Sequence, residues 1–165
     1  MHTITKQYRT ETGHRLVDYD GKCSHFHGHS YLWEVTVTAD KLTDNGMIID
    51  FKRLKSAMKQ ILEPLDHCMI LCNTDSGAER FTEIMATNGE KPRIILLDIN
   101  PTAENMAMVF GDQIAVHLSG CRLVEVKLWE TTTSFAVYKQ VRKIDRKLTD
   151  HIVYHYNQGL TNEQV

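Results

Sequence analysis

The side chains best suited to chemistry lie in one short segment, where a thiol and two imidazoles precede an alternating strand pattern. Cys23 comes first, and His27 and His29 follow it. Side chains of a strand alternate between its two faces, so the two histidines share a face and lie about 6–7 Å apart along the strand. Two imidazoles at this spacing can share one zinc ion, whose bonds to nitrogen measure about 2.0–2.1 Å.

A zinc ion that performs catalysis needs three protein ligands and one open position. His14, in the preceding segment, can supply the third nitrogen. Cys23 has three interpretations: a buried structural thiol, a fourth ligand that closes a merely structural zinc site, or a catalytic base or nucleophile activated by nearby cations and metal. The spacing alone leaves these three interpretations open.

Two other places in the chain carry side chains suited to proton transfer or ligand binding. Asp66 and His67 are either turn residues or a proton shuttle, in which the carboxylate raises the basicity of the imidazole. Glu130 falls at the next position of the alternating apolar pattern in the strand before it. Its carboxylate is therefore either exposed to solvent or held partly buried. A partly buried carboxylate would suit a ligand edge that presents two N–H donors.

Hydrophobic periodicity predicts the scaffold that must position these groups. Residues 10–23 are expected to form a loop, and residues 72–93 a polar region around a possible short helix before the apolar run 94–97. Strand pairs separated by helices predict an α+β fold, with an antiparallel sheet and helices on one face. The strands are expected at residues 2–9, 31–38, 122–130 and 134–138.

Two helices are expected between the strand pairs. Asp50 can cap the first, whose apolar face ends before Pro64. Thr102 is the natural cap of the second, which ends near Gly120. Glu104 falls in the first turn of that helix, where a negative charge interacts favourably with the helix N-terminus.

The bulk composition bounds the class of protein. With 165 residues, the chain is expected to form one domain over residues 1–165, with a core at about 2–140 and a C-terminal extension at 141–165 whose role is not legible. A net charge of −2 and the lack of a basic run argue against binding to nucleic acid. No apolar run approaches the roughly 18 residues of a membrane span, so we expect a cytoplasmic protein with reduced thiols.

Six motifs in this order resemble the family of 6-pyruvoyl-tetrahydropterin and 6-carboxy-tetrahydropterin synthases, over most of residues 4–138. No single motif is decisive, but their order is a strong signal. The motifs are Gly13-His14-Arg15-Leu16, Cys23-x3-His27-Gly28-His29, Gly46-Met47-Ile48-Ile49-Asp50-Phe51, Leu65-Asp66-His67, Pro101-Thr102-Ala103-Glu104-Asn105 and Trp129-Glu130-Thr131-Thr132-Thr133-Ser134-Phe135.

The resemblance implies the tunnelling fold, a β–β–α–α–β–β unit whose trimers pair into a homohexamer with active sites at subunit boundaries. It also implies a role for each candidate site residue. Zn²⁺ would lie on His14, His27 and His29, with Cys23 as the catalytic thiol. Asp66 and His67 would form a proton relay on the opposite side of the substrate. Glu130 would anchor the pterin and belong to the catalytic set, with Thr102 and Glu104 as further contributors to substrate binding.

The short gap between Cys23 and His27 resembles the carboxy-forming enzymes of queuosine and 7-deazapurine biosynthesis. The implied reaction converts 7,8-dihydroneopterin triphosphate to 6-carboxy-5,6,7,8-tetrahydropterin, acetaldehyde and triphosphate. Three alternatives remain: the pyruvoyl-forming reaction on the same substrate, a non-catalytic zinc-stabilised oligomeric module with four protein ligands, and a related pterin aldolase or epimerase. The sequence identifies neither the residues that hold the triphosphate nor the role of residues 72–97.

Overall fold

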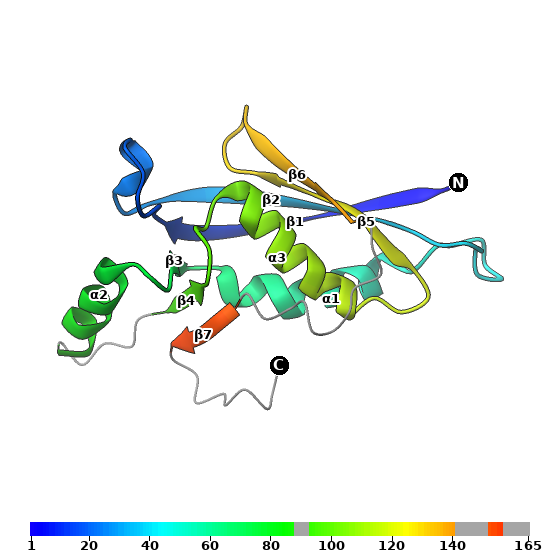
Figure 1. Cartoon of the computed structure of the whole chain (residues 1–165). Helices are drawn as coiled ribbons and strands as arrows, with labels where there is room; N and C mark the ends of the chain where they lie inside the picture. Colours follow the sequence, from blue (N-terminus) through cyan, green and yellow to red (C-terminus); the bar gives the residue numbers. More distant parts are fainter. Residues whose placement is uncertain (88–92, 141–151, 157–165) are drawn as a thin grey trace.

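The computed structural model describes residues 1–87, 93–140 and 152–156. Within these ranges, seven strands form a single sheet in the order β6-β5-β2-β1-β3-β4-β7 (Figure 1). The strands are β1 (Thr3–His14), β2 (His27–Thr38), β3 (Cys68–Cys72), β4 (Ile94–Leu97), β5 (Arg122–Trp129), β6 (Phe135–Lys139) and β7 (Ile152–Tyr156). The helices are α1 (Phe51–Leu62), α2 (Ser76–Thr87) and α3 (Ala103–Val116), with short 3₁₀ turns η1 (Lys22–Ser24) and η2 (Glu63–Leu65).

The expected α+β architecture is confirmed, and four of its strands form the expected antiparallel unit. Strands β6, β5, β2 and β1 pair antiparallel, whereas β3 runs parallel to β1 and β4 runs parallel to β3. The sheet is therefore mixed. The two parallel strands are continuous apolar runs buried on both faces, which is typical of parallel strands and gave no alternating signal.

Strand β1 is longer than its polar sequence predicts. It pairs with β2 residue for residue, from Thr3 opposite Thr38 to His14 opposite His27. The prediction of a loop from residue 10 was therefore wrong. The inward-facing threonines of this part are buried and find hydrogen bonds: Thr12 donates to the carbonyl of Leu65 at 2.9 Å, and Trp33 Nε1 donates to Thr10 Oγ1 at 3.0 Å. These bonds allow polar residues to occupy a core-facing position.

Helices α1 and α3 lie together along one face of the sheet (Figure 1), as predicted. Both begin at the predicted caps, since Asp50 accepts a hydrogen bond from the amide of Lys52 and Thr102 accepts one from the amide of Asn105. From Tyr31 onward, the odd-numbered residues of β2 meet these helices and are fully buried; Trp33, for example, packs edge-on against Phe110 with ring centroids 5.9 Å apart.

Helix α2 lies where a possible short helix was expected within residues 72–93, and it packs on the opposite face of β3 and β4. Leu71 and Ile94 turn to that side and are buried with Ala78, with Phe81 of α2 packed against them. Helix α2 thus lies in the chain between the parallel strands β3 and β4, in the kind of crossover connection that parallel strands require. Helices α1, α2 and α3 are each too short or too polar to cross a bilayer, and so are the other described helical segments.

Strand β7 was not predicted, because it lies in the 141–165 extension whose pattern was not legible. It pairs antiparallel with β4 at one edge of the sheet. Residues 141–151 and 157–165 lie outside the described part of the chain. The expectation of one domain over residues 1–165 stays a prediction.

Candidate metal centre and active site

Strand register brings the three predicted histidines together. His14 pairs directly with His27, and the next inward-facing pair along the strands is Thr12 with His29. The ring centroid of His14 lies 4.5 Å from that of His27 and 5.2 Å from that of His29, and the centroids of His27 and His29 are 5.0 Å apart. One nitrogen from each ring lies within 4.8 Å of the other two, so the cluster could hold a metal ion.

Backbone carbonyls orient two of the three rings. Nδ1 of His14 lies 2.8 Å from the carbonyl oxygen of Pro101, and Nδ1 of His27 lies 2.8 Å from that of His25. A carbonyl can only accept, so each Nδ1 carries the proton and each Nε2 has an unprotonated lone pair. Metal-binding histidines are held in this way. Nε2 of His29 is buried and has no hydrogen-bond partner among the described residues, as expected of an atom that awaits a ligand.

Electrostatics favour neutral rings. Burial lowers the pKa of His14, although the hydrogen bond to Pro101 and the charge of Glu130 act in the opposite direction. Burial likewise lowers the pKa of His29. Both rings therefore remain neutral at pH 7, which is the state that binds a metal without first releasing a proton.

Cys23 lies on η1, in the loop between β1 and β2, and is half-buried. The amide of Leu16 donates to its carbonyl oxygen at 2.8 Å, which closes the loop. Burial chiefly raises the pKa of Tyr31, and Cys23 contributes to this shift, so the thiol lies within electrostatic range of the site. Within the described ranges, however, no sulfur or carboxylate oxygen joins the three imidazole nitrogens in the metal-sized cluster.

Glu130 reaches the same site from β5. Leu128 pairs with Trp33, so continuing the register places Glu130 beside Tyr31. Its Oε1 lies 3.5 Å from Nε2 of His14 and 3.7 Å from Nε2 of His29, and its side chain is 28% exposed. Of the two alternatives for Glu130, the structure therefore shows the partly buried carboxylate.

Tyr31 is a site residue that the sequence interpretation counted only as core. It is fully buried, and its hydroxyl donates to Nε2 of His14 across 3.1 Å. The raised pKa of the phenol keeps it protonated and able to donate. One signal was available, since Tyr31 continues the odd-numbered parity of His27 and His29 along the strand.

Asp66 and His67 form a pair, with Nδ1 of His67 3.0 Å from Oδ2 of Asp66. The amide of Glu11 donates to the other carboxylate oxygen at 2.7 Å and is the chief reason that the pKa of Asp66 is lowered. Both side chains are open to solvent, 72% exposed for His67 and 40% for Asp66. His67 has a φ of 58°, a left-handed backbone conformation that few residues other than glycine adopt.

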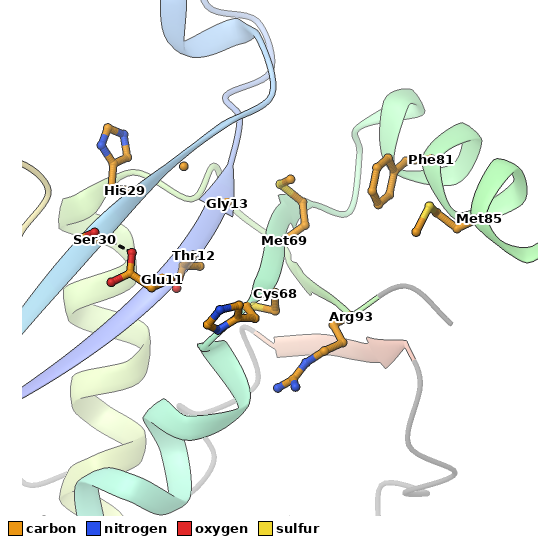
Figure 2. Close-up of a pocket in the computed structure, with 12 residues that line it drawn as sticks. Glu11, Thr12, Gly13, His29, Ser30, Cys68, Met69, Phe81, Met85 and Arg93 are labelled. Atoms are coloured by element: carbon orange, nitrogen blue, oxygen red, sulfur yellow. Dashed lines mark hydrogen bonds between the residues drawn. The ribbon is translucent and has the colours of Figure 1, made fainter. Parts of the chain in front are cut away.

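His67 borders a pocket of about 530 Å³ on the α2 side of the sheet. Figure 2 shows this pocket between the β1–β2 strands and helix α2, with Phe81 and Met85 on its far wall. Glu11 and Ser30, which also line it, alternate with the inward-facing residues of their strands. The ring of His29 points away from Met69 and Arg93 (Figure 2). Of the three histidines, His29 also lines this pocket, whereas His14 and His27 do not. The exposed ring of His67 thus lies on the α2 side of the strands, apart from the cluster that His14 forms with His27.

Thr102 and Glu104 are placed at the start of α3, and their predicted roles in substrate binding stay predictions. Thr102 caps the helix, and Glu104 is an exposed residue of its first turn. The structure gives the surrounding motif another role, which the sequence interpretation missed. Pro101 orients His14, while the side chain of Asn100 both accepts from and donates to the backbone of Val17 at 2.9 Å.

Fold and site together define an α+β protein with a candidate three-histidine metal centre at the end of its central strand pair. Residues 3–141 match the family model described as 6-pyruvoyl tetrahydropterin synthase, and the chain belongs to this family. It is 33% identical to the 6-carboxy-5,6,7,8-tetrahydropterin synthase of Aquifex aeolicus, with 83% of this chain and 97% of the relative covered. The enzyme of the same name from Haemophilus influenzae is 31% identical, with 85% of this chain and 100% of the relative covered.

Solved structures support the fold. The Caenorhabditis elegans 6-pyruvoyl tetrahydropterin synthase superposes with a TM-score of 0.60 at 22% sequence identity, covering 84% of this chain and 95% of that one. The sequence-based recognition of the family and of its fold is confirmed.

Removing one imidazole should abolish stabilisation by a metal. We expect Zn²⁺, used as the probe ion, to raise the unfolding temperature of the native protein, because an ion at 100 times its Kd stabilises the folded state by about 2.7 kcal/mol. In His27→Ala this rise should disappear. Thermal unfolding after chelation and titration with Zn²⁺, together with elemental analysis, measures both effects.

His25→Ala is the matched control, because His25 is exposed and contributes only its backbone carbonyl to the site. It should keep the full rise in unfolding temperature. An equal rise in His27→Ala would show that Zn²⁺ binds elsewhere.

Proposed function

We propose that this protein is a zinc-dependent carbon–carbon lyase that converts 7,8-dihydroneopterin triphosphate to 6-carboxy-5,6,7,8-tetrahydropterin, acetaldehyde and triphosphate. The observation that carries the proposal is the set of three convergent histidine nitrogens without a fourth protein ligand among the described residues. A structural zinc site is usually closed by four protein ligands, whereas a catalytic one keeps a position open. The name shared by the 31–33% identical relatives supports the particular reaction.

His14, His27 and His29 would hold the zinc ion through their Nε2 atoms. A zinc ion bound there would act as a Lewis acid toward the hydroxylated side chain of the substrate and acidify the neighbouring C–H bonds. The protein supplies a rigid seat, because the carbonyls of Pro101 and His25 hold two of the rings. Tyr31 can donate a hydrogen bond to an oxygen at the centre once Nε2 of His14 is engaged.

Two groups are assigned to proton transfer. Cys23 lies in the loop that borders the site and would take or return a proton at one face of the substrate carbon. His67 would do so at the other face. Asp66 accepts from Nδ1 of His67 at 3.0 Å, which orients the ring and leaves Nε2 for the substrate. The left-handed backbone of His67 supports this role, since unusual backbone conformations gather at functional sites.

Glu130 would bind the pterin ring. Its carboxylate is partly buried at the rim of the histidine cluster, with one oxygen 3.5 Å from His14. A pterin presents a ring N–H and an amino group on one edge, and two carboxylate oxygens accept such a donor pair in bidentate fashion. This arrangement would hold the hydroxylated side chain of the substrate toward the histidines.

The placement of His67 supports a homo-oligomer with shared active sites. His67 lines the pocket on the α2 side, whereas His14 and His27 do not line it, so a second copy of the chain would complete a substrate site that uses both. His67 is 72% exposed and available to a second copy of the chain. The hexamer of paired trimers implied by the resemblance would supply that copy.

A product assay tests the proposed reaction. Zinc-loaded protein incubated with 7,8-dihydroneopterin triphosphate should release acetaldehyde and triphosphate and form 6-carboxy-5,6,7,8-tetrahydropterin, resolved by mass spectrometry. The pyruvoyl-forming rival would consume the substrate without acetaldehyde. A non-catalytic module would leave the substrate intact.

Cys23→Ala should lose activity while it retains the metal. The reason is that Cys23 is assigned to proton transfer and lies outside the cluster of metal-binding nitrogens. General acid–base groups contribute typically about 10²–10⁴-fold in rate, so kcat should fall by at least a hundredfold. Elemental analysis should still find zinc. Loss of the metal in this variant would assign Cys23 to the metal as a fourth ligand.

Glu130→Gln should mainly weaken binding of the pterin. The substitution keeps the size of the side chain but replaces one acceptor oxygen by a donor that opposes the N–H edge of the ring. We expect KM to rise at least tenfold, measured by steady-state kinetics on zinc-loaded protein. An unchanged KM with normal turnover would remove Glu130 from the site. Glu125→Gln, on the same strand, is a control that should leave KM unchanged.

A further inference from the structure

An ion pair with a buried carboxylate connects the loop between β1 and β2 to the start of helix α2. Nε of Arg15 lies 2.8 Å from Oδ2 of Asp75, whose side chain is only 1% exposed. Arg15 directly follows the candidate ligand His14, whereas Asp75 immediately precedes α2. A buried carboxylate is stable only when it is paired, and removal of one partner leaves an uncompensated charge. This pair therefore fixes the end of β1 against the β3–α2 connection.

Aromatic contacts extend the same attachment to the other end of the loop. The guanidinium of Arg15 lies 4.9 Å over the ring of Phe26, and the rings of Phe26 and Phe81 are 5.7 Å apart. Phe26 directly precedes His27, the first residue of β2. The segment 15–26 is thus attached to α2 through both of its ends, beside two of the three candidate metal ligands.

Close packing and hydrogen bonding define the geometry of the pair. The amide of Gly77 donates to Oδ1 of Asp75 at 2.7 Å. Oδ2 and Nε of Arg15 face each other as an ion pair without the geometry of a hydrogen bond. A Cβ at Gly77 would lie 2.9 Å from Oδ1 of Asp75 and 3.2 Å from a guanidinium nitrogen of Arg15. A larger residue would push the two side chains apart, so glycine here permits the close approach.

The remaining contacts of the loop lie on its other side. Asn100 holds the backbone of Val17 by two hydrogen bonds, and Leu16 closes onto Cys23. These bonds connect the loop to the segment before α3 and to itself. The connection to α2 comes from Arg15, Asp75 and the two phenylalanine rings. Along the chain, Cys23 lies between Arg15 and Phe26.

We propose that Arg15 and Asp75 are positioning residues. They hold loop 15–26, and with it the Cys23 thiol, in place beside the histidine cluster. The proposal rests on the proposed function, in which Cys23 transfers a proton. It gives helix α2 a role in positioning the Cys23 thiol. It also assigns a function to Arg15, Phe26 and Asp75, which are not among the candidate catalytic or metal-binding groups.

Asp75→Asn tests the proposal in the full-length, zinc-loaded protein. The substitution keeps the size of the side chain but leaves Arg15 without its charge partner. Lys22 is exposed within the loop, so trypsin cleavage after Lys22, mapped by mass spectrometry, reports how well the loop is held. We expect this cleavage to accelerate about tenfold, while cleavage after Lys41, in the loop between β2 and α1, stays within twofold. In the lyase assay, kcat should fall about tenfold and KM stay within twofold.

Two comparisons separate positioning from a general loss of stability. Tyr138→Phe removes a 2.8 Å hydrogen bond from β6 to Asp112 of α3, far along the chain from the loop, and should change neither Lys22 cleavage nor kcat. The double variant Arg15→Gln with Asp75→Asn removes both charges. It should be no worse than Asp75→Asn alone, because neither partner is then left as an unpaired charge.

Unchanged cleavage after Lys22 in folded Asp75→Asn would overturn the proposal, and so would an equal fall of kcat in Tyr138→Phe. Should Asp75→Asn not fold, Phe26→Leu replaces it, since Phe26 is 43% exposed and tolerates substitution. Phe26→Leu should accelerate Lys22 cleavage at least threefold, and no acceleration would count against the proposal. If the native protein lacks lyase activity, the proposed function fails, whereas the proteolysis still decides whether the pair holds the loop.

Discussion

The pairing of β1 with β2 is the constraint on which the candidate site depends. The two strands match without a shift over twelve residue pairs, and this register sets His14 directly across from His27. A slip by one residue would turn every inward side chain of one strand to the other face. Packing prevents such a slip, because Trp33 and Tyr8 must stay on the side covered by α1 and α3. The hydrophobic core therefore positions the metal-binding nitrogens.

The candidate site is partly exposed because helices α1 and α3 do not cover the strands as far as their ends. Along β2, Trp33 and Tyr31 are fully buried, whereas the side chain of His29 is 21% exposed and His27 is also only partly buried. Burial thus decreases toward the loop that carries Cys23. His14, His27 and His29 would hold a metal ion at this partly exposed end of the strand pair. Catalysis at a metal needs this combination of a rigid seat and an open position.

Much of this arrangement was predictable from local patterns in the sequence. The alternation of strand residues indicated that His27 and His29 share a face, and the N-terminal caps of α1 and α3 were predicted correctly. Three features were not. Thr10 and Thr12 concealed the second half of β1, because their hydroxyls are satisfied by partners distant in sequence. The parallel strands β3 and β4 have no alternation to detect. Asp66 and His67 were expected to act as a pair, and the structure adds that the ring of His67 lies on the α2 side of the strands.

The two faces of the sheet explain why helix α2 matters to the histidine cluster. Residues of β1 and β2 alternate, so each candidate ligand has neighbours that point the other way, Arg15 beside His14 and Phe26 beside His27. These neighbours meet α2 through Asp75 and Phe81. A strand is stiff across its width, because both faces share one backbone. Contacts on the α2 face therefore hold the ends of β1 and β2 that carry His14 and His27.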